Sequence, residues 1–123
     1  MTQGEKDILL KDLCARLPYG VKVQTGPRRD ETDYSKVIYD NVETLDFIMM
    51  SIMFEDNIEE YKPYLFPLSS MTEEQKIEEY KLMNSNLYTS TVELPDFYDK
   101  NHFDYRGLIP MGLAIDASGK NIY

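Results

Sequence analysis

The N-terminal part of the chain has leucines at helical spacing, and a proline ends that pattern. Apolar residues within Glu5–Leu17 fall at Leu9, Leu10, Leu13, Cys14 and Leu17, among others. Spacings of three and four place these side chains along one stripe of a helix. Pro18 ends the helix because it pushes the preceding residue out of the α region, and Gly20 lets the chain reverse. We therefore expect an amphipathic helix whose apolar stripe, Cys14 included, must be buried against other elements.

A segment rich in β-branched and aromatic residues follows this helix. Val21–Gln24 alternates apolar and polar residues, as a half-buried strand does, and Gly26–Pro27 marks a turn. Tyr34–Val42 and Leu45–Phe54 have the composition that strands favour. These segments predict a three-stranded antiparallel meander, and Ile58–Leu65 is expected to add a fourth short strand.

The second half of the chain carries helix signals. Thr72 and Gln75 form a capping box, which starts a helix, and Pro95 suits the first turn of a shorter helix. The apolar stripe of the first of these helices is predicted to face the core, and Glu74, Glu78 and Glu79 to face water. That stripe consists of Ile77, Tyr80, Met83 or Asn84, and Leu87. The predicted fold is a single α+β domain over residues 1–123, with an N-terminal helix, a three- to four-stranded antiparallel meander and two C-terminal helices packed on the sheet.

Composition limits the classes of function. The chain of 123 residues is 42% hydrophobic and 28% charged, which is typical of a folded domain, and its formal net charge is −9. This charge disfavours direct binding to a nucleic-acid backbone. The N-terminus lacks the apolar run of a signal peptide, and Phe47–Phe54 is too short to span a bilayer. Cys14 is the single cysteine, so no internal disulfide forms, and we expect a cytoplasmic protein that does not use a membrane.

Three stretches of the chain resemble a known family. They are residues 11–22 (KDLCARLPYGVK), 62–75 (KPYLFPLSSMTEEQ) and 102–116 (HFDYRGLIPMGLAID). In this order they are similar to a family of small uncharacterised proteins from gut bacteria, their phages and other mobile elements. Family members usually carry a tryptophan before the third stretch, whereas this chain has Phe97 and Tyr98 there. The resemblance implies a phage or mobile-element origin in a bacterial host, and it implies no activity.

Catalytic and metal-binding groups are sparse. His102 is the single histidine, so a catalytic dyad must use it, and a zinc site would need Cys14 with carboxylates. Neither arrangement has a recognised spacing, and no phosphate-binding glycine loop or nucleophile elbow occurs. We therefore predict no catalytic residue, no metal and no cofactor. A hydrolase that uses His102 with Asp99 or Asp104 is the weakest of three functional hypotheses, and the other two follow.

The segment His102–Gly107 admits two interpretations. Its polar groups, His102, Asp104, Tyr105 and Arg106, resemble a small site for an anionic ligand. The structural interpretation is favoured: Asp104 caps a turn or pairs with Arg106, the aromatic residues pack on the second helix, and Gly107 has a positive φ angle. Arg28 and Arg29, in a predicted hairpin loop, are further candidates for a phosphate clamp. Together these residues define the alternative function, a protein that binds or sequesters a nucleotide.

The favoured function is protein binding without catalysis. Acidic residues cluster at Glu55, Asp56, Glu59 and Glu60, and again at Glu73, Glu74, Glu78 and Glu79. Such runs usually form solvated faces, but they also suit contact with a basic, nucleic-acid-binding protein. The ten tyrosines exceed what a core of this size needs and suit an interaction surface. We expect an accessory protein of a phage or mobile element that binds a host or phage protein, in a counter-defence or regulatory role, and an exposed edge strand would permit a homodimer.

Overall fold

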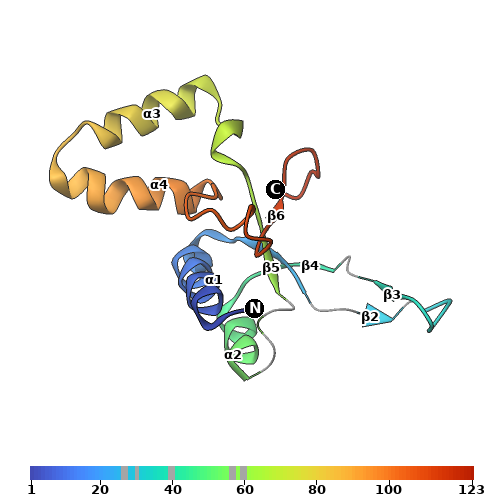
Figure 1. Ribbon diagram of the computed structural model, residues 1–123. Helices are drawn as coiled ribbons and strands as arrows, with labels where there is room; N and C mark the ends of the chain where they lie inside the picture. The colour runs from blue at the N-terminus through green and yellow to red at the C-terminus, as the bar shows by residue number, and fades with distance from the viewer. Residues whose placement is uncertain (26–27, 30, 39–40, 56–57, 59–60) are drawn as a thin grey trace.

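The computed structural model describes residues 1–25, 28–29, 31–38, 41–55, 58 and 61–123 (Figure 1). The fold is α+β, with four α-helices and a four-stranded mixed sheet among these residues. The helices are α1 (Gln3–Arg16), α2 (Phe47–Glu55), α3 (Glu73–Met83) and α4 (Leu94–Lys100). The strands are β1 (Lys22–Gln24), β2 (Arg28–Arg29), β3 (Val37–Ile38), β4 (Val42–Thr44), β5 (Lys62–Leu65) and β6 (Ile115–Asp116).

The predicted antiparallel meander is wrong. The sheet has the strand order β4-β1-β5-β6, in which β1 pairs antiparallel with both β4 and β5, while β5 and β6 are parallel. The strand expected near the end of Ile58–Leu65 is confirmed as β5. It lies at the centre of the sheet, and its parallel partner β6 comes from the C-terminal part of the chain. The parallel pair is long-range, so local sequence patterns do not reveal it.

The predicted third strand, Leu45–Phe54, is wrong, because the chain is helical from Phe47 to Glu55. Asp46 starts α2, because its carboxylate accepts a hydrogen bond from the backbone of Met49 at 2.7 Å and its carbonyl accepts one from Met50. This is the geometry of an N-cap. A short, continuous apolar run has no period that separates helix from strand, so the capping aspartate was the informative signal.

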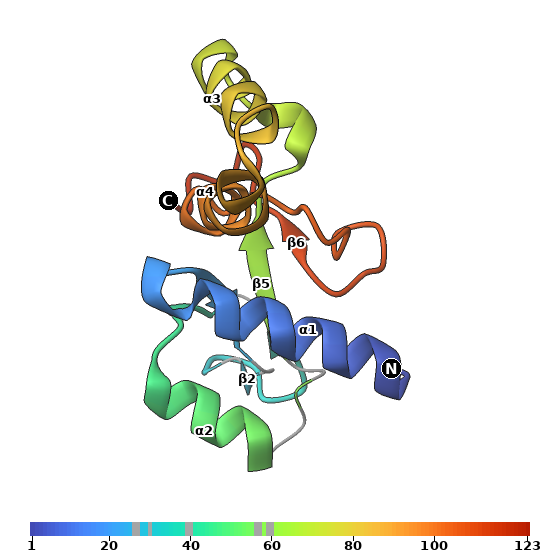
Figure 2. The ribbon, with the colours of Figure 1, turned by 90° about the vertical axis from the view of Figure 1, so that its left-hand side faces the viewer.

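Helices α1 and α2 cover one face of the sheet and enclose the main core (Figure 2). This core joins α1, β1, α2, β5 and the turns after residue 107 through Leu9, Leu13, Val21, Val23, Leu45, Met50, Leu65, Leu108, Leu113 and Ala114. The predicted N-terminal helix is confirmed, and Thr2 begins it with a capping box to Glu5. Cys14, however, is exposed, so its predicted burial is wrong. The face opposite to it buries Asp12 and Arg16 instead.

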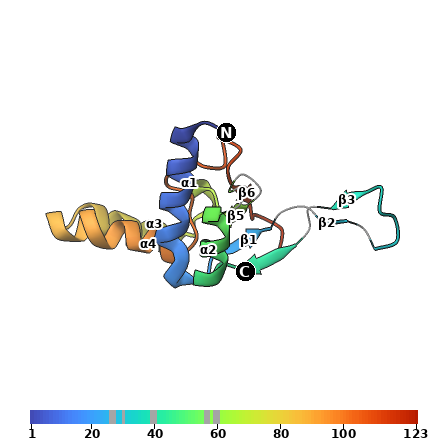
Figure 3. The same cartoon turned by 90° about the horizontal axis from the view of Figure 1, so that it is seen from below.

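Helices α3 and α4 form a hairpin that we call the arm (residues 72–100). A π-helical turn, Thr89–Glu93, precedes α4, and Pro95 lies in the first turn of α4 as predicted. The capping box of Thr72 and Gln75 is also confirmed. The two helices pack on each other, and the arm projects from the body beyond the end of β5 instead of lying across the sheet (Figures 1 and 3). The predicted packing of both helices on the sheet is therefore wrong.

Strands β2 and β3 form a separate two-stranded ribbon on the other side of the body from the arm (Figure 3). Arg28 pairs with Ile38 and Arg29 with Val37, so both arginines belong to a strand and not to the predicted hairpin loop. The turn predicted at Gly26–Pro27 lies outside the described residues, as do Asp56, Glu59 and Glu60 of the first acidic cluster.

Candidate protein-binding surface

An apolar face of the arm is exposed to solvent. We call it the arm stripe, and it consists of Ile77, Tyr80, Met83 and Leu87, which are 55%, 68%, 54% and 81% exposed. These are the side chains predicted to face the core, so that prediction is wrong. Ile77, Tyr80 and Met83 lie on α3, whereas Leu87 lies beyond its end, because α3 stops at Met83 and does not continue to Leu87 as predicted. Among the described residues, the contacts within the chain leave each of these four side chains more than half exposed.

The side of α3 that faces α4 is partly polar. Leu82 packs against a small core of Met71, Phe97 and Phe103. Glu79, expected to face water, accepts a hydrogen bond of 2.7 Å from the phenol of Tyr98 in α4. Burial and the nearby carboxylate raise the pKa of Tyr98, so its hydroxyl stays a donor. This contact holds Glu79 on the side of α3 that faces α4, whereas the other glutamates of α3 are exposed.

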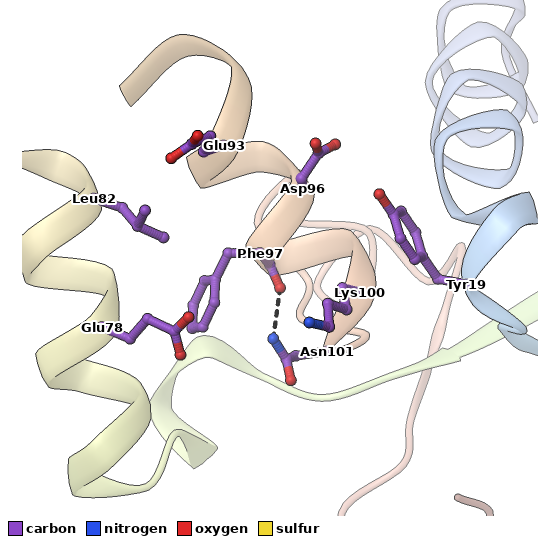
Figure 4. Close-up of a pocket in the computed structure, with 8 residues that line it drawn as sticks. All are labelled: Tyr19, Glu78, Leu82, Glu93, Asp96, Phe97, Lys100 and Asn101. Atoms are coloured by element: carbon purple, nitrogen blue, oxygen red, sulfur yellow. Dashed lines mark hydrogen bonds between the residues drawn. The ribbon is translucent and has the colours of Figure 1, made fainter. Parts of the chain in front are cut away.

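A shallow pocket lies between α3 and α4, beside the turn that follows α1 (Figure 4). Its volume is about 320 Å³, which is near the lower limit for ligand pockets. Leu82 and Phe97 supply its apolar wall, and Glu78, Glu93 and Asp96 supply carboxylates. Apart from Phe97, these side chains are largely solvent-exposed or half-buried, so the carboxylates stay hydrated and the pocket is a groove of the arm surface.

At the base of the arm, four charged side chains form what we call the ionic cluster: Asp12, Arg16, Asp99 and Arg106. Asp12 and Arg16 are fully buried in α1. The two carboxylate oxygens of Asp12 accept hydrogen bonds from Arg16 Nε at 2.9 Å and Arg106 Nη1 at 2.8 Å. Arg16 also donates from Nη2 to the carbonyl of Phe103 at 2.6 Å. Two arginines and two aspartates balance, so the cluster is neutral overall.

Asp99 joins this cluster to the arm. Its carboxylate lies 3.5 Å from Arg106 Nη1 and accepts a hydrogen bond of 3.3 Å from the phenol of Tyr105. Burial raises the pKa of Asp99, although the charges of Arg16 and Arg106 oppose this shift. The Tyr105 ring stacks on Tyr98 with centroids 4.9 Å apart and lies under the Arg106 guanidinium at 4.4 Å. Contacts thus run without a break from α1 through α4 to Glu79 of α3.

The segment from His102 to Gly107 shows two features of the structural interpretation, a capping Asp104 and a positive φ at Gly107. The Asp104 carboxylate accepts hydrogen bonds from the backbone of Leu108 and Ile109 at 2.8 and 2.9 Å, so it caps a turn and does not pair with Arg106. Gly107 has a φ of 76°, as predicted. The Tyr105 phenol, with a pKa raised to about 12 by burial and the Asp99 charge, is a donor within the cluster.

His102 packs beside the same turn. Its ring stacks on Tyr123 with centroids 4.0 Å apart, and its φ is 62°. Burial, reinforced by the charges of Arg16 and Lys22, lowers the pKa of His102 to about 4, so the imidazole is neutral at pH 7. The Tyr123 hydroxyl accepts a hydrogen bond from Lys22 of β1 and donates one to the carbonyl of Tyr64 in β5, and so it bridges two strands.

The predicted ligand-binding residues do not form one site. Tyr105 and Arg106 lie together in the ionic cluster, Asp104 faces the following turn, and His102 packs on Tyr123. Arg28 and Arg29 lie on the separate ribbon (Figure 3). Sequence reasoning missed Asp12 and Arg16. Their spacing of four in a helix indicates an ion pair, but such pairs are usually exposed, and nothing local signals their burial.

Within the described ranges, no group of three or more histidine, cysteine, aspartate and glutamate side chains is placed to hold a metal ion. None of the described helices is long and apolar enough to cross a membrane. No protein-family model, curated protein or solved structure matches this chain.

Proposed function

We propose that this protein acts without catalysis, by binding another protein through the arm stripe. The observation that carries the proposal is the exposure of Ile77, Tyr80, Met83 and Leu87 on a projecting helical arm. Exposed apolar patches of a few hundred Å² are about as large as the largest patch on a typical monomer, and such patches are often interaction sites. Full burial of one such side chain contributes about 1.5–3 kcal/mol, so a partner that covers the stripe gains substantial binding free energy.

The setting of this binding is also a proposal. The resemblance of residues 11–22, 62–75 and 102–116 to proteins of gut bacteria and their phages supports an accessory role in a phage or mobile element. The net charge of −9 and the supply of tyrosines support contact with host or phage proteins inside the bacterial cell. We do not propose nucleotide binding or hydrolysis. Arg106 and Tyr105 are engaged by Asp12 and Asp99, and His102 stacks on Tyr123.

Affinity capture with matched variants tests the proposal. We expect the tagged protein to retain specific partners from a lysate of its host cell and the variant Tyr80→Gln/Leu87→Gln to lose them. Glutamine keeps helix propensity, so the change removes apolar surface without breaking the arm. The control is Phe47→Gln/Ile48→Gln, because these α2 side chains are 75% and 71% exposed and lie outside the arm.

The control is expected to retain the partners. Purified partner and protein are then titrated by calorimetry, in which the stripe variant should bind at least tenfold more weakly than the control variant. Equal loss of binding in both double variants, or loss in the α2 variant alone, would contradict the assignment of the binding surface to the arm.

A further inference from the structure

The charged residues beside the arm stripe indicate which kind of partner can cover it. Glu74, Glu78 and Lys81 are exposed and follow one another at spacings of four and three, so they form a ridge along one edge of the stripe. Its N-terminal half is acidic and its C-terminal half is basic. When two copies of one helix pack antiparallel, the same edges of the two helices meet, with opposite ends together. The acidic half of one copy then faces the lysine of the other.

We propose that a second copy of this chain covers the arm stripe, through antiparallel packing of the two α3 helices. This inference rests on the proposed function, because it assigns a second copy of the chain as a partner of the arm stripe. In a two-fold arrangement centred on Tyr80, Ile77 of each copy lies opposite Met83 of the other. Lys81 then comes beside Glu78 of the second copy, and the symmetry makes this ion pair twice.

The antiparallel arrangement has two further supports. Helix dipoles attract when they run in opposite directions, and α3 has Glu73 and Glu74 in its first turn and Lys81 in its last. The arm also projects from the body, on the side away from the β2–β3 ribbon (Figures 1 and 3). A basic foreign protein is less well matched to the stripe, because Lys76 and Lys81 lie among its acidic neighbours.

The dimer is expected to be weak. The four side chains of the arm stripe, of which Ile77, Tyr80 and Met83 belong to α3, offer at most on the order of 400 Å² per copy, about half of the roughly 800 Å² per partner in a standard interface. Each copy also carries a net charge of −9, which repels the other at long range. Salt screens this repulsion, so the dimer becomes tighter as ionic strength rises, whereas binding of a basic foreign protein becomes weaker.

Sedimentation equilibrium of the purified chain over a range of protein and salt concentrations tests this inference. We expect a monomer–dimer equilibrium with a dissociation constant on the order of micromolar to tens of micromolar, strengthened by salt. Tyr80→Gln should abolish the dimer. Lys81→Glu should weaken it about tenfold, because both intermolecular ion pairs become repulsive.

A charge exchange gives the decisive control. The double variant Glu78→Lys/Lys81→Glu reverses both members of the pair and should restore the dimer to within about twofold of the original, while either single change weakens it. Circular dichroism confirms that each variant is folded. A chain that stays monomeric up to about 1 mM, or a double variant as weak as the single ones, would overturn the inference.

These outcomes separate the two proposals. If the chain is monomeric while Tyr80→Gln/Leu87→Gln still loses a foreign partner in the capture experiment, the second copy is wrong and the proposed function stands. If the stripe variants change neither self-association nor capture, both are wrong.

Discussion

The base of the arm buries charged side chains, whereas the arm stripe exposes apolar side chains to solvent. At the base, Asp12 and Arg16 are fully buried in a helix of an acidic protein. Along the stripe, Tyr80 and Leu87 are more than two-thirds exposed. Burial of charges costs desolvation free energy, and exposure of large apolar groups forgoes hydrophobic stabilisation. Each region therefore lowers the stability of the chain by itself. We infer that the buried charges hold the arm in one orientation, in which the stripe is exposed to a partner.

The ionic cluster has the geometry to hold that orientation. Replacement of a buried ion pair by apolar residues is often neutral or stabilising, so such pairs are weak evidence of stability. Hydrogen bonds between fixed donors and acceptors are directional, however, and apolar packing is not. Arg106 and Asp99 meet the buried Asp12–Arg16 pair at defined distances, and we infer that this fixes where α4 leaves the body.

The largest expected effect is at the base. Asp12→Ala leaves Arg16 and Arg106 without their shared carboxylate, and loss of one member of a buried pair costs about 3–5 kcal/mol. We expect the free energy of unfolding, measured by urea denaturation, to fall by this amount. The matched control is Asp7→Ala on the exposed side of the same helix, which should change stability by less than about 0.5 kcal/mol. Equal losses of stability in Asp12→Ala and Asp7→Ala would contradict the burial of Asp12 in an ion pair at the base of the arm.

The next effect concerns pH. The pKa of His102 is about 4 in the folded protein, against 6.5 for a free histidine, so between these pH values the unfolded chain binds a proton that the folded chain does not. The contribution of His102 to stability is therefore complete above pH 6.5 and falls as pH decreases towards 4, by at most about 1.4 kcal/mol per pH unit.

His102→Asn isolates this term, because asparagine tolerates a positive φ and does not titrate. Urea denaturation of both proteins across this pH range should show a shallower acid loss for the variant. Parallel curves would show that His102 is not packed on Tyr123 in solution.

A smaller effect sharpens the link between the two regions. Tyr98→Phe removes the hydrogen bond to Glu79 and should reduce the free energy of unfolding by about 1 kcal/mol. Because this bond joins α4 to α3, the loss should appear locally. Amide hydrogen exchange is expected to accelerate in α3 and to stay unchanged in α1. Uniform acceleration in both helices would contradict a local role.

The smallest effect is expected at the stripe. Tyr80→Gln/Leu87→Gln should change the unfolding free energy by less than about 0.5 kcal/mol at low protein concentration, since neither side chain is packed within the chain. Thermal denaturation of dilute protein measures this. A loss of more than about 1 kcal/mol would show that the stripe is covered intramolecularly.

Prediction from sequence succeeded where the signal was local. The capping box at Thr72, the proline in α4, the end of α1 before Gly20 and the turn capped by Asp104 all depend on residues a few positions apart. It failed at α2, where a continuous apolar run conceals the period and the cap at Asp46 was overlooked. It also failed for the meander, since the parallel pairing of β5 with β6 joins distant segments.

The sequence by itself determined the α+β class, the presence of the N-terminal helix and the start of α3 after Thr72, because capping and helical spacing act within a few residues. Tertiary structure alone decided which face of α3 is exposed and which charges are buried. Arg106 meets Asp12 from 94 positions away, and a pattern read along one helix gives no information on such a partner. The apolar stripe is a property of the sequence, and its exposure is a property of the fold.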